Sequence, residues 1–174
     1  MWKHLIKEEI SFLKSAFLRY NGFINEKEDS RMLVKQINVF LENSFGRLAE
    51  VTKVLGKADI DIRALFVADS TDYGILRMIL DKPEEAVMIL TESGFTVSMT
   101  PVLAIAIPDK AGTLDAALST FSTTGESMEY IYGFVGRKSD EAVMVIRVQN
   151  FDPVIRKFEE AGIRILSPEE VYGI

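Results

Sequence analysis

Apolar and polar residues between positions 32 and 101 follow a series of patterns that predicts six elements. Alternation from Leu33 to Leu41 is typical of a strand, and apolar residues at helical spacing follow it between Leu48 and Leu55. Two further strand patterns, a second helix pattern and a last strand pattern complete the segment. The predicted order of elements is therefore β-α-β-β-α-β.

The segment from 102 to 174 repeats the same order of patterns. "TESGFTV" and "EEAGIRI" align at an offset of 68 residues (91 to 159), and "GILRMIL" and "AVMVIRV" share that offset (74 to 142). Two different elements that recur in the same order and spacing indicate an internal duplication. A split β-α-β repeat predicts a ferredoxin-like sandwich, with helices on one face of an antiparallel sheet. We therefore expect an α+β protein with two such domains, at residues 32–101 and 102–174.

Residues 1–31 lie outside the duplication. Apolar residues recur there every three or four positions from Trp2 to Tyr20, which predicts an amphipathic helix that docks on the sheet or on another subunit. A membrane-surface helix is a less favoured alternative, because Glu8 and Glu9 dilute the positive charge. A further alternative is that translation starts at Met32, since this segment has no counterpart in the repeat.

Composition and charge narrow the classes of function. The chain has 174 residues and a formal net charge of -6, and no basic stripe favours binding to nucleic acid. The absence of cysteine argues against thiolate metal sites. The chain has a single histidine, His4, and no cluster of residues with catalytic spacing. We expect no catalytic residue, no metal and no cofactor. Because no apolar run is long enough to cross a bilayer and no signal peptide pattern is present, we expect a cytoplasmic protein.

A polar, glycine-centred turn follows the first strand pattern of each repeat. It reads "ENSFGRL" and, 66 residues later (42 to 108), "PDKAGTL". A turn that leads into a helix offers unpaired backbone N–H groups and the positive end of the helix dipole, which favour a carboxylate. Glycine also lets a ligand approach the backbone closely. In the structural alternative, Asn43 and Asp109 are only turn and cap residues, and Gly46 and Gly112 only allow the bend.

The motifs "ENSFGRL…ADIDI" and "PDKAGTL…GESM" resemble those of ACT domains, the amino-acid-sensing modules of many biosynthetic enzymes. The resemblance covers residues 32–174 and implies two ACT units in tandem that pair side by side into a continuous antiparallel sheet. In such domains the turn holds the charged end of an amino acid, and a polar residue at the start of the second strand, often from the neighbouring unit, completes the site. The resemblance implies these ligand-binding residues: Asn43, Ser44, Phe45, Gly46, Arg47 and Leu48 in the first turn, Asp109, Lys110, Ala111, Gly112, Thr113 and Leu114 in the second turn, and Asp61 and Ser127 at the second strands.

The resemblance does not imply two equivalent sites. Asp109 replaces the asparagine of the family pattern, and Asp61 stands where asparagine is frequent. A carboxylate attracts a ligand ammonium and repels a ligand carboxylate. Side-by-side pairing would bring Asn43 to Ser127 and Asp109 to Asp61. We therefore expect one working site, built around Asn43 and Gly46 with Ser127.

The resemblance implies a non-catalytic regulatory protein that binds an amino acid, forms a homodimer and acts on a partner enzyme of amino-acid biosynthesis. Three alternatives remain. "INVFLENSFGRLAEVTKVL" is also similar to the start of the regulatory subunit of acetolactate synthase. A dimerisation module would leave both turns empty. An acylphosphatase-like hydrolase of the same fold is the least favoured, because its loop would present Arg47 and an asparagine to phosphate and the surrounding pattern is missing.

Overall fold

A computed structural model describes residues 32–42, 44–69, 73–135 and 140–174. The chain divides into two compact units. Of the described residues, the first unit contains 36–100, and the second contains 32–35 together with 101–174. The helix predicted between Trp2 and Tyr20, and the site residue Asn43, lie outside the described residues.

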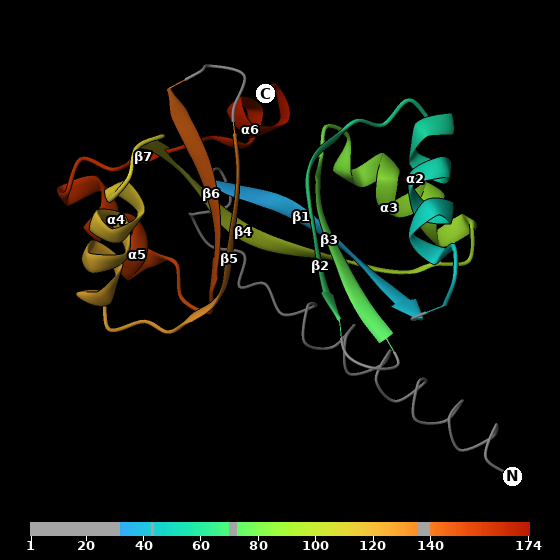
Figure 1. Ribbon diagram of the computed structural model, residues 1–174, viewed down its shortest axis with the longest axis horizontal. Helices are drawn as coiled ribbons and strands as arrows, with labels where there is room; N and C mark the ends of the chain where they lie inside the picture. Colours follow the sequence, from blue (N-terminus) through green and yellow to red (C-terminus); the bar gives the residue numbers. More distant parts are fainter. Residues whose placement is uncertain (1–31, 43, 70–72, 136–139) are drawn as a thin grey trace, which may run out of the picture. The chain divides into compact units, whose positions relative to one another are not determined.

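The first unit has the predicted β-α-β-β-α-β order. Its elements are β1 (Leu33–Glu42), α2 (Arg47–Lys57), β2 (Ile62–Asp69), β3 (Tyr73–Leu80), α3 (Pro83–Glu92) and the first part of β4 (Thr96–Pro108). The strands lie in the order β2-β3-β1-β4, and β3 pairs antiparallel with both β1 and β2 (Figure 1).

Helices α2 and α3 bury their apolar stripes against one face of this sheet. Val51 and Leu55 of α2 and Leu90 of α3 are fully buried in a cluster with Ile37 and Val39 of β1. This is the packing that amphipathic helices and alternating strands predict.

The other face of β1 carries two buried polar side chains. Gln36 and Asn38 are almost completely inaccessible to solvent. Their side chains are joined by a hydrogen bond of 2.6 Å, and the Asn38 amide nitrogen donates to the hydroxyl of Thr100 at 2.7 Å. These bonds are needed because an unpaired buried polar group costs about 1–3 kcal/mol.

The second unit repeats the first. Its elements are the last part of β4, α4 (Thr113–Ser122), β5 (Met128–Val135), β6 (Glu141–Val148), α5 (Asp152–Glu160), β7 (Arg164–Ile165) and a terminal helix α6 (Pro168–Tyr172). The strand order is β4-β6-β5, and β7 pairs antiparallel with β4. Phe121 of α4 and Phe158 of α5 pack on Ile105 and Ile146 in the second core.

Pro101 lies inside a strand and does not end it. β4 is 13 residues long and includes Pro101. The first compact unit ends at Thr100, and the second resumes at Pro101. A proline lacks the N–H group that a sheet ladder uses, but its carbonyl group remains available. The Pro101 oxygen accepts a hydrogen bond of 3.1 Å from Arg147. One strand therefore serves as the last strand of the first unit and the first strand of the second.

Candidate functional site

The glycine-centred turn has the same backbone conformation in both units. Gly46 (φ 84°) and Gly112 (φ 91°) are left-handed residues that immediately precede α2 and α4. Three backbone hydrogen bonds recur at an offset of 66 residues. In the first turn, the N–H groups of Ser44, Arg47 and Glu50 donate to the oxygens of Glu42, Ser44 and Gly46, respectively. In the second turn, those of Lys110, Thr113 and Ala116 donate to the oxygens of Pro108, Lys110 and Gly112. The sequence repeat is therefore a structural repeat, and glycine is required because other residues rarely adopt this φ.

Among the residues that the structure describes, no side chain caps the start of α2 or α4 at this turn. The Asp109 carboxylate makes no hydrogen bond within the described residues, and its backbone N–H donates to the Asp140 oxygen at 2.9 Å. The interpretation of Asp109 as a helix cap is therefore wrong. In contrast, Ser167 and Glu170 close a reciprocal capping box on α6. No described side chain therefore blocks the positive ends of α2 and α4, which favour an anion.

The side chains of the two turns differ. Of the turn side chains that the structure describes, Arg47 and Thr113 are half-buried and the others are exposed. Arg47 turns back along its helix, where it forms an ion pair of 2.5 Å with Glu50 and lies 4.8 Å from the ring centre of Phe95. The Thr113 hydroxyl lies within 2.8 Å of the Pro108 and Lys110 oxygens and so binds back to its own turn.

Within one unit, the turn and the start of the second strand lie apart. The 11 residues of α2 separate Gly46 from Asp61, a helix length of roughly 16 Å. In the second unit α4 separates Gly112 from the exposed Ser127 in the same way. Neither unit brings its own predicted residues together into one site, so the predicted pairing of Asn43 with Ser127 stays a prediction.

The second strands carry a feature that the sequence did not reveal. Their pairing is interrupted between Ile62 and Ala64 and, at the equivalent place, between Met128 and Tyr130. The residue at the irregularity is Arg63 in one unit and Glu129 in the other.

The equivalent side chains Arg63 and Glu129 have opposite charge. Arg63 lies 2.8 Å from the Asp61 carboxylate, and Glu129 lies 3.6 Å from Arg147. All but Asp61 have side chains that are no more than 16% exposed. Irregular pairing of this kind redirects side chains. It is visible in the pairing of the strands and not in the sequence of either strand alone. The two strand entries therefore differ in their charge arrangement.

The described residues offer little for other chemistry. None of them form a group of three or more histidine or acidic side chains that could hold a metal ion. Among the helices that the structure describes, none is long and apolar enough to cross a membrane.

Comparisons with known proteins agree with the duplicated fold. A family model described as "ACT domain pair" matches residues 32–165. The crystal structure of protein BT0572 from Bacteroides thetaiotaomicron is similar, with 38% identity, a TM-score of 0.77, and coverage of 82% of this chain and 98% of that one. The ligand-free regulatory subunit of aspartate kinase from Thermus thermophilus has 16% identity and a TM-score of 0.56, with coverage of 76% and 95%. A search of curated proteins found no significant match.

Proposed function

The chain belongs to the ACT family as an ACT domain pair, and from this premise we propose that it is a regulatory protein that binds an amino acid and has no catalytic activity of its own. The observation that carries the proposal is the turn before α2 and α4, which has the same left-handed glycine and the same three hydrogen bonds in both units. A duplicated conformation of this kind, open at a helix start, suits the carboxylate of an amino acid.

The first turn is the better candidate for a working site. The Asp109 carboxylate of the second turn would repel the carboxylate of an amino acid. The Thr113 hydroxyl also engages two oxygens of that turn. The first turn instead presents a fully exposed ring, Phe45, next to Gly46, so an apolar surface lies beside the open helix start.

The position of Arg47 supports a role without catalysis. A phosphate-binding loop of the acylphosphatase kind would need this guanidinium group directed at the loop. Here it is paired with Glu50 and lies over Phe95, and its Nε atom is buried. A regulatory role requires that a partner enzyme respond differently to the loaded and the empty protein. The similarity in fold to a regulatory subunit of aspartate kinase makes an enzyme of amino-acid metabolism our proposed partner.

The direct test is a thermal-shift screen of the full chain against each of the common amino acids. A ligand at about 100 times its Kd adds roughly 2.7 kcal/mol to the stability of the folded state, so we expect one amino acid to raise the Tm by roughly 5–10 °C. Its amide, which lacks the carboxylate, is expected to have no effect. A screen in which no amino acid changes the Tm of a folded sample would contradict the proposal and favour the ligand-free dimerisation module.

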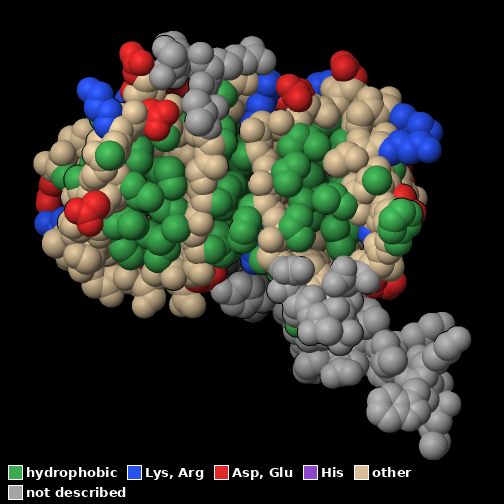
Figure 2. All heavy atoms as spheres, viewed as in Figure 1, with side chains coloured by type: hydrophobic (Ala, Val, Ile, Leu, Met, Phe, Trp, Pro, Cys, Tyr) green, Lys and Arg blue, Asp and Glu red, His purple; other side chains and the backbone are tan. Residues whose placement is uncertain are grey.

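We further propose that the protein forms a homodimer through β2. This strand lies at the end of the order β2-β3-β1-β4, so one of its backbone edges faces away from the described sheet of the first unit. Leu65 and Val67 oppose the buried Met78 and Leu76 and so point to the core face of the sheet, yet they are 49% and 38% exposed. Exposed hydrophobic side chains occur in both units (Figure 2). An apolar edge strand is a template for pairing with another strand.

The double variant Leu65→Lys/Val67→Lys is expected to convert the dimer into a monomer, because lysine on an edge strand opposes pairing. Light scattering coupled to size-exclusion chromatography would measure the change as a halved mass. Met88→Lys is the matched control, since Met88 is a comparably exposed hydrophobic residue, at 55%, that belongs to α3 and not to β2. A double variant that keeps the mass of a dimer would exclude β2 as the interface.

A further inference from the structure

The second unit contains a groove that the proposed amino-acid site does not use. It has a volume of about 400 Å³ and lies where β4 ends, α4 begins and α5 ends. Its lining includes the small side chains Ala116 and Ala117 of α4, together with Thr113, Glu141 and Ile163. The volume falls at the lower end of the range that small-molecule sites occupy.

The equivalent place in the first unit is filled by side chains of the protein itself. The two units superpose by residue here, because Gly94 and Gly162 both have positive φ and are followed by equivalent hydrogen bonds. These bonds join the Phe95 N–H to the Leu90 oxygen at 3.0 Å and the Ile163 N–H to the Phe158 oxygen at 2.8 Å. Phe95 and Ile163 are therefore structural counterparts, as are Arg47 and Thr113 after the left-handed glycines.

The side chain of Arg47 shows what fits in such a place. Its guanidinium group lies 4.8 Å from the centre of the Phe95 ring and pairs with Glu50. In the second unit the three counterparts of these residues are Thr113, Ile163 and Ala116, and all three line the groove. The second unit therefore lacks a guanidinium group, an aromatic ring and a carboxylate at the positions of Arg47, Phe95 and Glu50, and the groove lies there instead.

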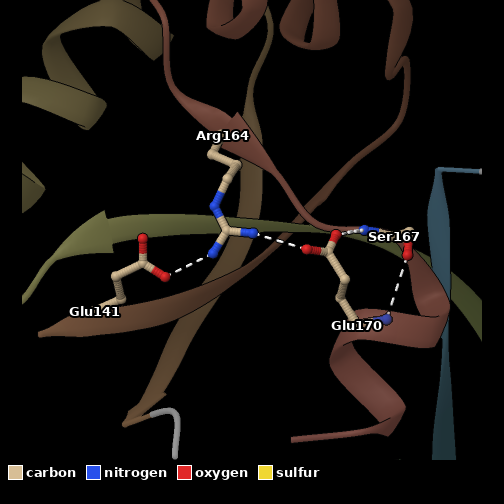
Figure 3. A network of polar contacts seen from close by, with 4 residues as sticks. All are labelled: Glu141, Arg164, Ser167 and Glu170. Carbon is tan, nitrogen blue, oxygen red and sulfur yellow. Dashed lines mark hydrogen bonds and ion pairs between the residues drawn. The ribbon is translucent and has the colours of Figure 1, made fainter. Parts of the chain in front are cut away.

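The groove runs along the flank of α4, beside Thr113, Ala116, Ala117 and Thr120, and not over the positive end of this helix. The charged side chains at this flank favour a cation. The two terminal nitrogens of Arg164 lie 2.6 Å from Glu141 and 2.8 Å from Glu170, so this guanidinium is already balanced by two carboxylates (Figure 3). Glu170 is in turn held by Ser167 (Figure 3). The second carboxylate oxygen of Glu141 has no hydrogen bond within the part of the chain that the structure describes. An anion would meet the net negative charge of this network.

We propose that this groove binds a small molecule with a guanidinium group on a short aliphatic chain, in the place that the Arg47 side chain fills in the first unit. The chain lies against Ala117 and Ile163, and the guanidinium donates to the free oxygen of Glu141. This site is independent of amino-acid binding at the turn, because its ligand needs no carboxylate.

The probes that test this proposal are n-butylguanidinium and its uncharged isostere n-butylurea. Methyl NMR spectra of the full chain would follow Ala117 and Ile163 during each titration. Because Glu141 is 43% exposed, the attraction is screened, and we expect a Kd of about 1 mM for n-butylguanidinium. We expect n-butylurea to bind at least about fivefold more weakly. Equal affinity for the two probes, or unchanged methyl resonances at about 10 mM of n-butylguanidinium, would overturn the proposal.

Two variants locate the site. Glu141→Gln is expected to remove the preference for n-butylguanidinium, while the control Asp152→Asn keeps it, because Asp152 begins α5 and the groove lies at the other end of that helix. Thr113→Arg/Ile163→Phe rebuilds the side chains of the first unit and is expected to abolish binding. Binding that survives in this second variant, or a preference that survives Glu141→Gln, would show that the probe binds elsewhere. Since the Glu141 variant changes one half-exposed group, the test does not depend on whether the filled variant folds.

Discussion

Replacing Gly46 with valine is expected to abolish the ligand-induced rise in Tm. A β-branched residue at φ 84° is strained, which lowers the free energy of unfolding by roughly 1–3 kcal/mol. The new side chain would meet nothing within 4 Å of its Cβ in the folded protein, so the variant is expected to fold. It would instead occupy the open space beside the turn, where the ligand approaches the backbone. Thermal shift with the amino acid found in the screen measures the loss.

The matched control is Gly112→Val. Gly112 has φ 91° and nothing within 4 Å of an added Cβ, so the two variants are strained equally. We expect the second variant to keep the ligand response, because Asp109 makes the second turn unfavourable for a carboxylate. A response that survives Gly46→Val but is lost in Gly112→Val would assign the working site to the second turn instead. Loss of the response in both variants would indicate two coupled sites.

Truncation of Phe158 to alanine is expected to have the largest effect on stability. This side chain of α5 is fully buried in the second core, where it packs with Phe121 and Ile105. Removal of a buried phenylalanine ring costs about 3–5 kcal/mol, through lost transfer energy and the cavity that remains. This cost is a large fraction of the typical stability of a protein, about 5–15 kcal/mol. Urea-induced unfolding followed by circular dichroism measures the change.

Two variants serve as controls for Phe158→Ala. Glu159→Ala changes the next, exposed residue and is expected to alter stability by less than about 0.5 kcal/mol. Leu90→Ala removes the equivalent buried side chain of α3 in the first unit, at a cost of about 2–5 kcal/mol. A small effect of Phe158→Ala, with a full effect of Leu90→Ala, would contradict the central position of Phe158 in its core.

The repeated elements could be predicted because their signals are local. Apolar alternation in β1 and helical spacing in α2 reflect the geometry of single elements, which a few residues encode. The turn at Gly46 and Gly112 was equally accessible, since the left-handed conformation needs glycine whatever surrounds it. The contact at Pro101 of β4 is not local: its oxygen accepts a hydrogen bond from Arg147, 46 residues further along the chain.

The contacts that distinguish the two turns could not be predicted. Arg47 begins α2, whereas Phe95 lies in the turn between α3 and β4, and only the packing of the whole unit brings the guanidinium over the ring. The irregular pairing that places Arg63 and Glu129 depends on strand register, which no single strand encodes.

The sequence by itself determined the order of elements, the duplication and the position of both glycine turns, because periodicity and backbone preference act over a few residues. Only the tertiary structure decided which side chains meet. It placed the Arg47 side chain over Phe95 in one unit and left a groove beside Thr113 in the other. Those outcomes depend on volumes and charges contributed by elements far apart in the chain, and close packing resolves them only when the whole unit has folded.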